Sequence, residues 1–425
     1  MKTRPLKGEI ALPGDKSISH RAVMFSSIAN GESVFTNLSN GADVKSTIDI
    51  LKKLGSNIEF DDGTLRTKST GLHSLAGKDL ALDCGNSGTS LRLLSGFLCG
   101  QDVENVSLVG DESLSRRPHD RVINPLQKLG VNISGRDGCY TPVVLSKSEP
   151  IGGRIEMEIA SAQVKSAVLL SGLYSKNPTT VIEHEHTRNH SEIMLKKMGA
   201  QITVSGNGSN VESTIHPIES DLQPISCVIP GDPSSAAFFG VAASIIPDSE
   251  IVIRNLLLNE HRIGWIKVLI EMGANIQIDK SESELGEIVG DVYISSSELH
   301  GVDISTDIAS MVDELPILSL AMVFANGTSK VSNAKELRVK ESDRISVVVD
   351  HLDRAGVQVN EFDDGYEIFE SMPKSCEIKS NGDHRIAMTF AILNYISTGE
   401  MPEVDKNIIS TSFPGFFDLF KTLID

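Results

Sequence analysis

The chain has 425 residues, of which 40% are hydrophobic and 23% charged, and its 39 basic against 57 acidic side chains give a formal net charge of −18. This length suffices for roughly two to three domains that each bury a core. The acidic excess argues against a general nucleic-acid binder and against a polybasic membrane anchor, because both need a basic surface. It also means that the long-range field would not help an anionic substrate to arrive.

The N-terminal segment is charged and is interrupted by Pro13-Gly14, so it lacks the apolar core of a signal peptide. The longest weakly polar stretch, residues 234–246, is too short to span a bilayer. The five cysteines form no CxxC pair and are odd in number, which indicates neither a zinc site nor a disulfide framework. We therefore expect a cytoplasmic protein with no membrane association and no bound metal.

One short pattern, Leu-x-x-apolar-Gly-x-x-Ile/Val, recurs along the chain at similar intervals. It predicts the end of an amphipathic helix, a glycine in the left-handed cap conformation and the entry of a strand. The FFDLFKTLID segment at the C-terminus resembles the helix of a further copy. The glycines of the complete copies are Gly55, Gly130, Gly199, Gly273 and Gly356.

Tight-turn signals follow four of these five glycines, and each lies between short β-prone runs. The fourth repeat has a longer acidic segment instead, residues 280–286. Each repeat therefore predicts a strand and a helix, then a second helix with its glycine cap and two strands joined by a tight turn, and six such α/β repeats fill the chain. The turn signals are Asp62-Gly63, Asp137-Gly138, Gly206-Asn207-Gly208 and Asp364-Gly365.

A second repeat divides the six into two sets of three. The segment Pro13-Gly14-Asp15-Lys16-Ser17 returns as Pro230-Gly231-Asp232-Pro233-Ser234, and each copy precedes a helix of small residues. Ser17 or Ser19 in the first copy, and Asp232 or Ser234 in the second, are suitable N-caps. We therefore predict an α/β protein of two similar halves.

The first copy differs from the second by its cations. Lys16, Ser17 and Arg21 fall at a helix start, where backbone N–H groups and the helix dipole favour anions. Solvent-exposed charges would explain this pattern equally well. Gly85-Asn86-Ser87-Gly88 forms a second glycine-rich helix entry, which suits a phosphate or carboxylate but is also ordinary turn chemistry.

Further polar groups follow along the first half. Arg116-Arg117-Pro118 is a basic turn, in which the arginine before the proline is biased towards extended backbone. Ser161-Ala162-Gln163 opens an apolar helix, and Arg188 lies beyond it. The three histidines around Arg188 are close enough in sequence to suggest a metal site, but their polar surroundings favour an exposed strand end; they are His184, His186 and His190.

In the second half, Asp313-Glu314 precedes an apolar helix and predicts either a cap or a catalytic carboxylate. The charged run from Arg338 to Arg344 is compatible with a salt-bridged helix face or with a binding site. Gly382-Asp383-His384-Arg385 starts one more helix. If the two halves closed on each other, these helix starts would form one site for a polyanion.

Together these strings resemble the 5-enolpyruvylshikimate-3-phosphate (EPSP) synthase family. LPGDKSISHR, GNSGTSLR, RRP, SAQVKSA, DELP, RVKESDR and DHRIAM occur in the family's order over essentially the whole chain. The resemblance implies an inside-out α/β barrel of the enolpyruvyl transferase type, with three βαβαββ units in each of two domains. It places one domain at residues 14–228, the other at 1–13 plus 229–425, and the active site in the cleft between them.

By the same resemblance, the protein is a transferase of the shikimate pathway, which leads through chorismate to the aromatic amino acids. It would transfer the enolpyruvyl (carboxyvinyl) group of phosphoenolpyruvate to the 5-hydroxyl of shikimate 3-phosphate by addition–elimination, releasing phosphate. The resemblance implies no cofactor and a monomer whose only partners are these two small molecules.

The resemblance also assigns individual residues. Shikimate 3-phosphate would be held by Lys16, Ser17, Arg21, Ser161, Ala162, Gln163, Arg188, Asp313 and Lys340. Phosphoenolpyruvate would be held by Lys16, Gly88, Arg117, Gln163, Arg344 and Arg385. The catalytic residues would be Asp313, which takes the proton of the 5-hydroxyl, with Glu341 and Lys16 as candidates to protonate the methylene carbon.

Three positions bear on the subclass. Ala162 replaces a serine of many members, and Thr411 stands in a segment that lacks a lysine found before Phe-Pro in others. These features resemble the second subclass, which includes glyphosate-tolerant members. Gly88, however, is unsubstituted where some tolerant members carry alanine, so glyphosate sensitivity stays open.

Two alternative functions can be compared with the EPSP synthase interpretation. The related enolpyruvyl transferase that acts on UDP-N-acetylglucosamine would carry Lys-Asn in place of Lys16-Ser17 and a loop cysteine, whereas Cys139 directly precedes a β-prone run. A non-catalytic repeat scaffold would keep the glycines and hairpins but would not need cations at its helix starts. Both alternatives are therefore disfavoured.

Overall fold

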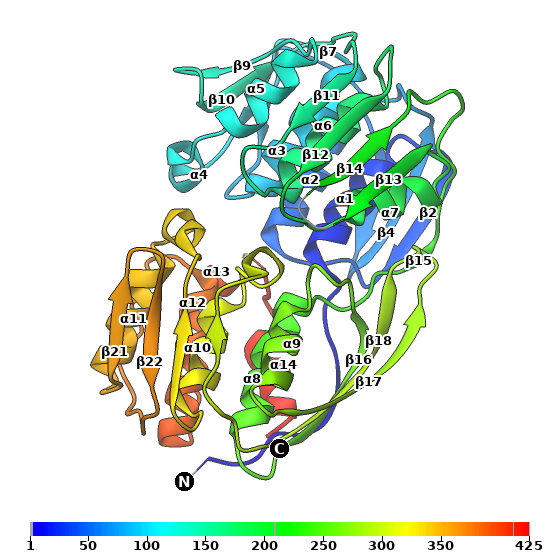
Figure 1. The fold of residues 1–425 in the computed structure, drawn as a ribbon. Helices are drawn as coiled ribbons and strands as arrows, with labels where there is room; N and C mark the ends of the chain where they lie inside the picture. Colours follow the sequence, from blue (N-terminus) through cyan, green and yellow to red (C-terminus); the bar gives the residue numbers. More distant parts are fainter. Residues whose placement is uncertain (1–2, 208–209, 411, 425) are drawn as a thin grey trace. The chain divides into compact units, whose positions relative to one another are not determined.

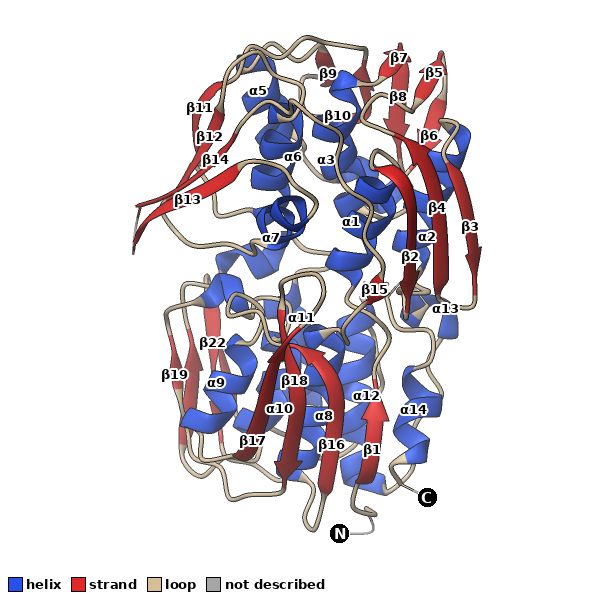
Figure 2. Ribbon diagram, turned by 90° about the vertical axis from the view of Figure 1, so that its right-hand side faces the viewer, coloured by secondary structure: helices blue, strands red, loops and turns tan. Residues whose placement is uncertain are grey.

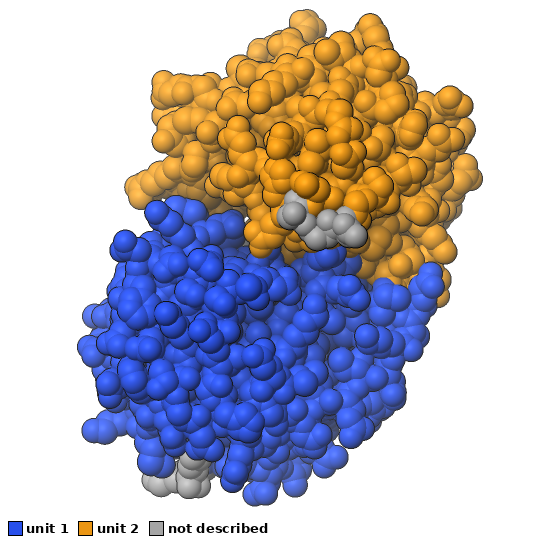
Figure 3. Space-filling view, in the orientation of Figure 1, with its two compact units in different colours: residues 1–13, 230–282, 288–425 blue, residues 14–229, 283–287 orange. Residues whose placement is uncertain are grey.

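The computed structural model describes residues 3–207, 210–410 and 412–424 of the chain. These residues divide into two compact units, which Figure 3 colours separately. The chain passes from one unit to the other at Pro13 and again at Ile229, next to the two Pro-Gly-Asp motifs. Unit 1 comprises Met1–Pro13, Pro230–Glu282 and Ile288–Asp425, and unit 2 comprises Gly14–Ile229 and Ser283–Glu287.

Unit 2 contains three four-stranded sheets among its described residues, and each follows the same topology (Figure 1). Two parallel strands lie side by side, and an antiparallel hairpin extends the sheet from the second of them. The first sheet has the order β15 (Cys227–Val228), β2 (Asn30–Thr36), β4 (Thr64–Thr70) and β3 (Asn57–Asp61). The second has the order β6 (Ala81–Asp83), β8 (Val106–Val109), β10 (Tyr140–Leu145) and β9 (Ile133–Arg136). The third has the order β11 (Gly153–Glu156), β12 (Thr179–Glu183), β14 (Asn210–Ile215) and β13 (Ile202–Asn207).

The helices of unit 2 fill the space behind these sheets, so the unit has helices inside and sheets outside (Figure 2). Three of them are buried on nearly every side: α1 (Lys16–Ser26), α3 (Gly88–Phe97) and α6 (Ala162–Gly172). A short parallel pair, β5 (Ala76–Lys78) and β7 (Asp102–Glu104), completes the strands. The helices are α1 (Lys16–Ser26), α2 (Ala42–Lys53), α3 (Gly88–Phe97), α4 (Glu112–Arg116), α5 (Asp120–Lys128), α6 (Ala162–Gly172) and α7 (His190–Lys197).

Among its described residues, unit 1 has two sheets of the same topology around a core of apolar helices. Its sheets are β1 (Lys7–Ala11), β16 (Glu250–Leu257), β18 (Ile288–Ser295) and β17 (Asn275–Glu282), and then β19 (Asp303–Ile304), β20 (Thr328–Val331), β22 (Gly365–Phe369) and β21 (Val359–Phe362). Its helices are α8 (Pro233–Ile245), α9 (Gly264–Glu271), α10 (Leu315–Val323), α11 (Arg344–Arg354), α12 (His384–Thr398), α13 (Lys406–Ile409) and α14 (Phe416–Thr422). Helix α10 is buried along its whole length, and α8 and α12 almost so. No described helix is long and apolar enough to cross a membrane.

The repeat pattern predicts the local structure of the first five repeats correctly. All five cap glycines have a positive φ, between 81 and 99°, as a helix end that turns into a strand requires. The four predicted turns each join an antiparallel hairpin, although residues 208 and 209 of the third turn lie outside the described residues. In the sixth repeat the described residues after β22 form helices only, α12 to α14.

The N-cap prediction for the first Pro-Gly-Asp motif is wrong. Neither Ser17 nor Ser19 caps α1; Asp15 does, and its Oδ1 accepts a hydrogen bond from the backbone N–H of Ile18 at 2.7 Å. Asp232 caps α8 in the same way, as one of the two alternatives predicted. Aspartate at the equivalent position of both motifs therefore defines both helix starts, and it makes Lys16 the first residue of α1.

Helices α3 and α6 cross so closely that the crossing depends on a glycine. A Cβ atom on Gly96 would lie 1.9 Å from the carbonyl oxygen of Ala167. We expect Gly96→Ala to destabilise the protein by about 1–3 kcal/mol, because a packed core has no room for an added methyl group. Urea unfolding measures the change. Gly415→Ala is the control, since its Cβ would meet no atom within 4 Å; equal stability of both variants would contradict the prediction.

Candidate active site

The first predicted cation lies at the start of α1. Nζ of Lys16 is 3.1 Å from Oδ2 of Asp43, which belongs to the first turn of α2. Ser17 follows Lys16 in the first turn and is partly exposed. Because the N–H groups of a first helical turn favour negative charge, Lys16 adds its charge where the backbone already attracts an anion.

Arg21 lies one turn further along α1 and is buried. Its Nε donates to Oγ of Ser191 at 2.8 Å, its Nη2 to Oγ of Ser166 at 2.7 Å, and its Nη1 to the carbonyl oxygen of Ser17 at 2.9 Å. Burial lowers the pKa of Arg21 to about 10, so the guanidinium stays charged at neutral pH. Arg21 is therefore a fixed cation held by neutral oxygens.

Further predicted residues gather at the start of α3. Ser87 caps this helix by accepting a hydrogen bond from the N–H of Ser90 at 3.1 Å, which makes Gly88 the first helical residue. Arg117 has extended backbone, as predicted before a proline, and its Nη2 donates to Oδ1 of Asn86 at 3.0 Å. The guanidinium of Arg117 thus lies next to the residue that precedes the cap.

Gln163, the second residue of α6, reaches the same helix start. Its Nε2 donates to Oγ1 of Thr89 at 2.9 Å, and its Oε1 accepts from Nη1 of Arg92. The structure therefore brings together three residues predicted for phosphoenolpyruvate around the first turn of α3: Gly88, Arg117 and Gln163.

The other predicted residues of unit 2 lie before α6 and α7. Ser161 caps α6, with its Oγ 3.5 Å from the N–H of Val164, and Ala162 is the first helical residue. Arg188 lies in the connection between β12 and α7 and is partly exposed. Burial is the main cause of the lowered pKa of Arg21, and the positive charge of Arg188 lowers it further.

The three neighbouring histidines have different environments. His184 is exposed after β12, as an exposed strand end predicts. His190 instead starts α7 and is buried, with Nδ1 2.7 Å from Oε1 of Glu287, so the prediction is wrong for this residue. A loop of the fourth repeat, 283–287, covers it, which a local pattern cannot show. Within the described ranges, no group of three or more His, Cys, Asp or Glu side chains is placed to hold a metal ion.

In unit 1, Arg344 is the centre of the predicted cluster. It is the first residue of α11 and is 1% exposed, yet it contacts three carboxylates. Its Nε donates to Oδ2 of Asp383 at 2.8 Å, its Nη2 to Oε2 of Glu341 at 2.7 Å, and its Nη1 to Oδ1 of Asp313 at 3.1 Å. Burial alone would lower the pKa of Arg344, but Asp383, Glu341 and Asp313 together raise it.

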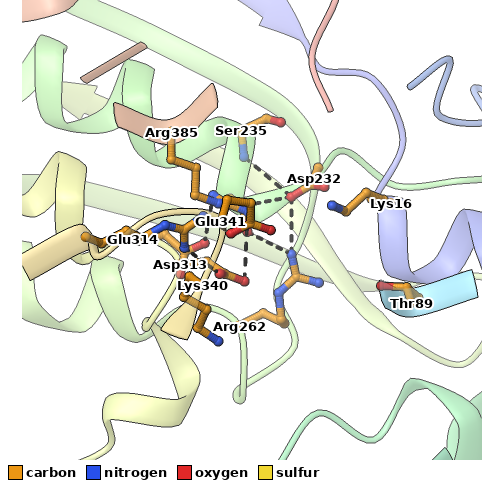
Figure 4. A network of polar contacts seen from close by, with 12 residues as sticks. Lys16, Thr89, Asp232, Ser235, Arg262, Asp313, Glu314, Lys340, Glu341 and Arg385 are labelled. Carbon is orange, nitrogen blue, oxygen red and sulfur yellow. Dashed lines mark hydrogen bonds and ion pairs between the residues drawn. The ribbon is translucent and has the colours of Figure 1, made fainter. Parts of the chain in front are cut away.

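Arg385 contributes the second cation of this cluster, as Figure 4 shows. Its Nη2 lies 3.9 Å from Oδ2 of Asp313, and its Nη1 lies 3.8 Å from Oε1 of the buried Glu314. Asp313 therefore lies between the guanidinium groups of Arg344 and Arg385, close to Glu341. All of the predicted catalytic and phosphoenolpyruvate-binding residues of unit 1 are in this group.

Lys340 belongs to the same segment but pairs differently, because its Nζ contacts Oε1 of Glu336 at 2.8 Å. The charged run from Arg338 to Arg344 is not one helix face. The run begins in a short 3-10 helix, Lys335–Val339, and ends at Arg344, the first residue of α11, so it includes the connection between two helices.

Sequence reasoning did not assign several residues that hold the predicted ones in place. Asp383 caps α12 through Oδ1 and binds Arg344 through Oδ2. Asp43 pairs with Lys16, and Thr89 and Arg92 orient Gln163. An aspartate directly before an apolar helix was a signal for Asp383 as a cap, whereas its bond to Arg344 depends on tertiary packing.

Comparison with known proteins agrees with this arrangement. The family described as EPSP synthase (3-phosphoshikimate 1-carboxyvinyltransferase) matches residues 1–420. The chain belongs to the EPSP synthase family. A relative from Thermodesulfovibrio yellowstonii, named 3-phosphoshikimate 1-carboxyvinyltransferase, is 45% identical and aligns over 99% of this chain and 98% of its own. One of the same name from Syntrophomonas wolfei is 42% identical, with 99% and 98% covered.

Solved structures of the family share the fold. EPSP synthase from Acinetobacter baumannii superimposes with a TM-score of 0.88 and 34% identity, over 99% of this chain and 96% of the other. The α/β fold and the transferase class expected from the sequence are thus confirmed. Membership of the EPSP synthase family disfavours both alternatives considered above, the UDP-N-acetylglucosamine enzyme and the non-catalytic scaffold. Thr411, which bears on the subclass, lies outside the described residues.

His119 is buried directly before α5, two residues after Arg117, and it should make the protein sensitive to acid. Burial, together with Arg92, Arg117 and Arg121, lowers the pKa of His119 from 6.5 to about 4. As the pH falls through this window the unfolded chain takes up the proton first, so stability decreases. Full titration corresponds to about 3 kcal/mol.

Urea unfolding at pH 7 and pH 5 tests this expectation. The free energy of unfolding should fall less between the two pH values in His119→Gln than in the unsubstituted protein. The same fall in both proteins would show that His119 does not contribute to the acid sensitivity.

Proposed function

We propose that the protein transfers the carboxyvinyl group of phosphoenolpyruvate to the 5-hydroxyl of shikimate 3-phosphate, which forms 5-enolpyruvylshikimate 3-phosphate and phosphate. The names of relatives that are 41–45% identical support this reaction. The structural observation that carries it is the cluster in which Asp313 lies between Arg344 and Arg385. This reaction belongs to the shikimate pathway of aromatic amino-acid biosynthesis.

For shikimate 3-phosphate we propose a site built mainly from the helix starts of unit 2. The cyclohexene ring of shikimate 3-phosphate carries hydroxyl groups, a carboxylate and a phosphate. Its binding site therefore needs both cations and neutral hydrogen-bond groups. Lys16 and Arg188 supply charge at partly exposed positions, and Arg21 supplies it from a buried one. The proposed residues are Lys16, Ser17, Arg21, Ser161, Ala162, Gln163 and Arg188, with Asp313 and Lys340 from unit 1.

For phosphoenolpyruvate we propose the start of α3 together with the arginines of unit 1. The N–H groups at Gly88 suit a phosphate or carboxylate oxygen, and Arg117 lies beside them. Arg344 and Arg385 have the planar, two-pronged geometry that binds carboxylate and phosphate groups. The proposed residues are Lys16, Gly88, Arg117, Gln163, Arg344 and Arg385.

The proposed chemistry is an addition followed by an elimination. Asp313 accepts the proton of the 5-hydroxyl while the oxygen attacks C2 of phosphoenolpyruvate, and Glu341 or Lys16 donates a proton to the methylene carbon C3. Loss of a proton from C3 and departure of phosphate from C2 then restore the double bond. Cationic side chains stabilise the charged tetrahedral intermediate. The reaction as written uses no metal ion or organic cofactor.

We also propose that the enzyme acts as a monomer in the cytoplasm, without nucleic-acid or membrane partners. Its acidic composition, with a net charge of −18, supports the absence of nucleic-acid and anionic-membrane partners.

Phosphate release tests the proposed function directly. The protein with both substrates should release phosphate, and omission of either substrate should abolish the signal. UDP-N-acetylglucosamine in place of shikimate 3-phosphate should give none. If shikimate 3-phosphate gives no turnover and no binding by calorimetry, the proposal is wrong.

Asp313→Ala separates binding from chemistry. We expect shikimate 3-phosphate binding to persist and kcat to fall about 10²–10⁴-fold, as for the loss of a general base. Asp350→Ala is the matched control in unit 1, because Asp350 is exposed and pairs with Arg354 on the surface of α11. Lost binding with an unchanged kcat would assign Asp313 a different role.

A further inference from the structure

A buried charge cluster around Lys165 lies in unit 2 and takes no part in the chemistry proposed above. Lys165 belongs to α6, and its side chain is 2% exposed. Its Nζ lies 2.8 Å from Oε2 of Glu183, at the end of β12, and 2.8 Å from Oε1 of Glu192, in α7. Both glutamates are buried as well. One cation thus joins a helix, a strand end and a second helix.

Lys165 is charged despite its burial. Burial alone would lower the pKa of Lys165, but Glu192 and Glu183 together raise it. A buried ion pair seldom stabilises a protein more than apolar side chains of the same volume would, because removing the charges from water costs free energy. Stability alone therefore does not explain why these three charges are buried together, and we consider a role in function.

The cluster also holds the connection between β12 and α7. The third hydrogen bond of Nζ of Lys165 goes to the backbone carbonyl oxygen of Thr187, at 3.2 Å. The hydroxyl of Thr187 donates to Oε1 of Glu183. Thr187 is thereby fixed through both its backbone and its side chain, and the next residue along the chain is Arg188, which is partly exposed.

The neighbouring residue of α6 fixes a second predicted binding residue. Oγ of Ser166 accepts from Nη2 of Arg21 and also contacts Oγ of Ser191, which accepts from Nε of the same arginine. Consecutive residues of α6 thus anchor Arg21 and the residue before Arg188. The positions of the two arginines are coupled through one helix.

We infer that Lys165, Glu183 and Thr187 are positioning residues that hold Arg188 in place for shikimate 3-phosphate. The inference rests on the proposed function, because it assigns these residues to the same substrate site. Their effect on the reaction should therefore pass through Arg188 and appear in the affinity for shikimate 3-phosphate.

Thr187→Val is the most informative variant. Lys165→Met would leave two buried carboxylates without their cation and could prevent folding, whereas valine keeps the shape of threonine and removes only the hydroxyl. We expect the KM for shikimate 3-phosphate to rise about 5- to 10-fold in Thr187→Val, with the KM for phosphoenolpyruvate and kcat changed less than about twofold. Thr187→Ser, which keeps the hydroxyl, should have the same KM for shikimate 3-phosphate as the unsubstituted protein.

Thr180→Val is the matched control. Thr180 is also a buried threonine of unit 2, but it lies in β12, and its Oγ1 contacts Oγ1 of Thr214 at 2.8 Å. We expect it to leave the KM for shikimate 3-phosphate unchanged. Melting temperatures of all variants verify that they are folded.

A double-mutant cycle with Arg188→Ala decides whether the effect passes through Arg188. In the Arg188→Ala background, Thr187→Val should cause no further loss of shikimate 3-phosphate binding by calorimetry. Additive losses would overturn the inference, and so would a normal affinity in Arg188→Ala alone. The unsubstituted enzyme is assayed first, so an absence of turnover there would refute the proposed function rather than this inference.

Discussion

The central helices of each unit are buried on almost every side, and the rest of the structure depends on this burial. The first N–H groups of a helix have no acceptor within the helix, so side chains, water or ligands must satisfy them. Asp15, Ser87 and Ser161 do so in unit 2, and Asp232 and Asp383 in unit 1. The remaining N–H groups and the helix dipoles favour anions at these same positions. A fold with helices inside therefore offers anion-binding helix starts as a consequence of its architecture.

Buried cations impose a second requirement, since each needs a carboxylate or several neutral acceptors. Arg344 has three carboxylates, Lys165 has two, and Arg21 is held by serine and backbone oxygens. This requirement changes the meaning of the net charge of −18. Part of the acidic excess neutralises the cations of the candidate site, while the site itself still presents arginine and lysine groups. The net charge is a sum over the whole chain and does not predict the charge of a particular site.

Local structure could be predicted wherever a short pattern specifies backbone geometry. A glycine such as Gly55 after an amphipathic helix favours the left-handed helix cap. An Asp-Gly pair between β-prone runs favours a tight hairpin turn. The cap of α1 was predicted wrongly as Ser17 or Ser19, because serine and aspartate are both good N-caps and Asp15 is close to both. The burial of His190 was missed, since Glu287 comes from a distant repeat. The sixth repeat kept the helix that its sequence predicted, but its described residues contain no strand.

The sequence by itself determined the repeats, the division of the chain at the Pro-Gly-Asp motifs and the set of residues that resembles the EPSP synthase family. These features depend on the order of a few residues, so a linear pattern contains them. Only the tertiary structure decided which carboxylate pairs with which cation, as for Asp383 with Arg344 and Glu183 with Lys165. The partners are separated by many residues, and it is the packing of buried helices that brings their side chains within hydrogen-bond distance.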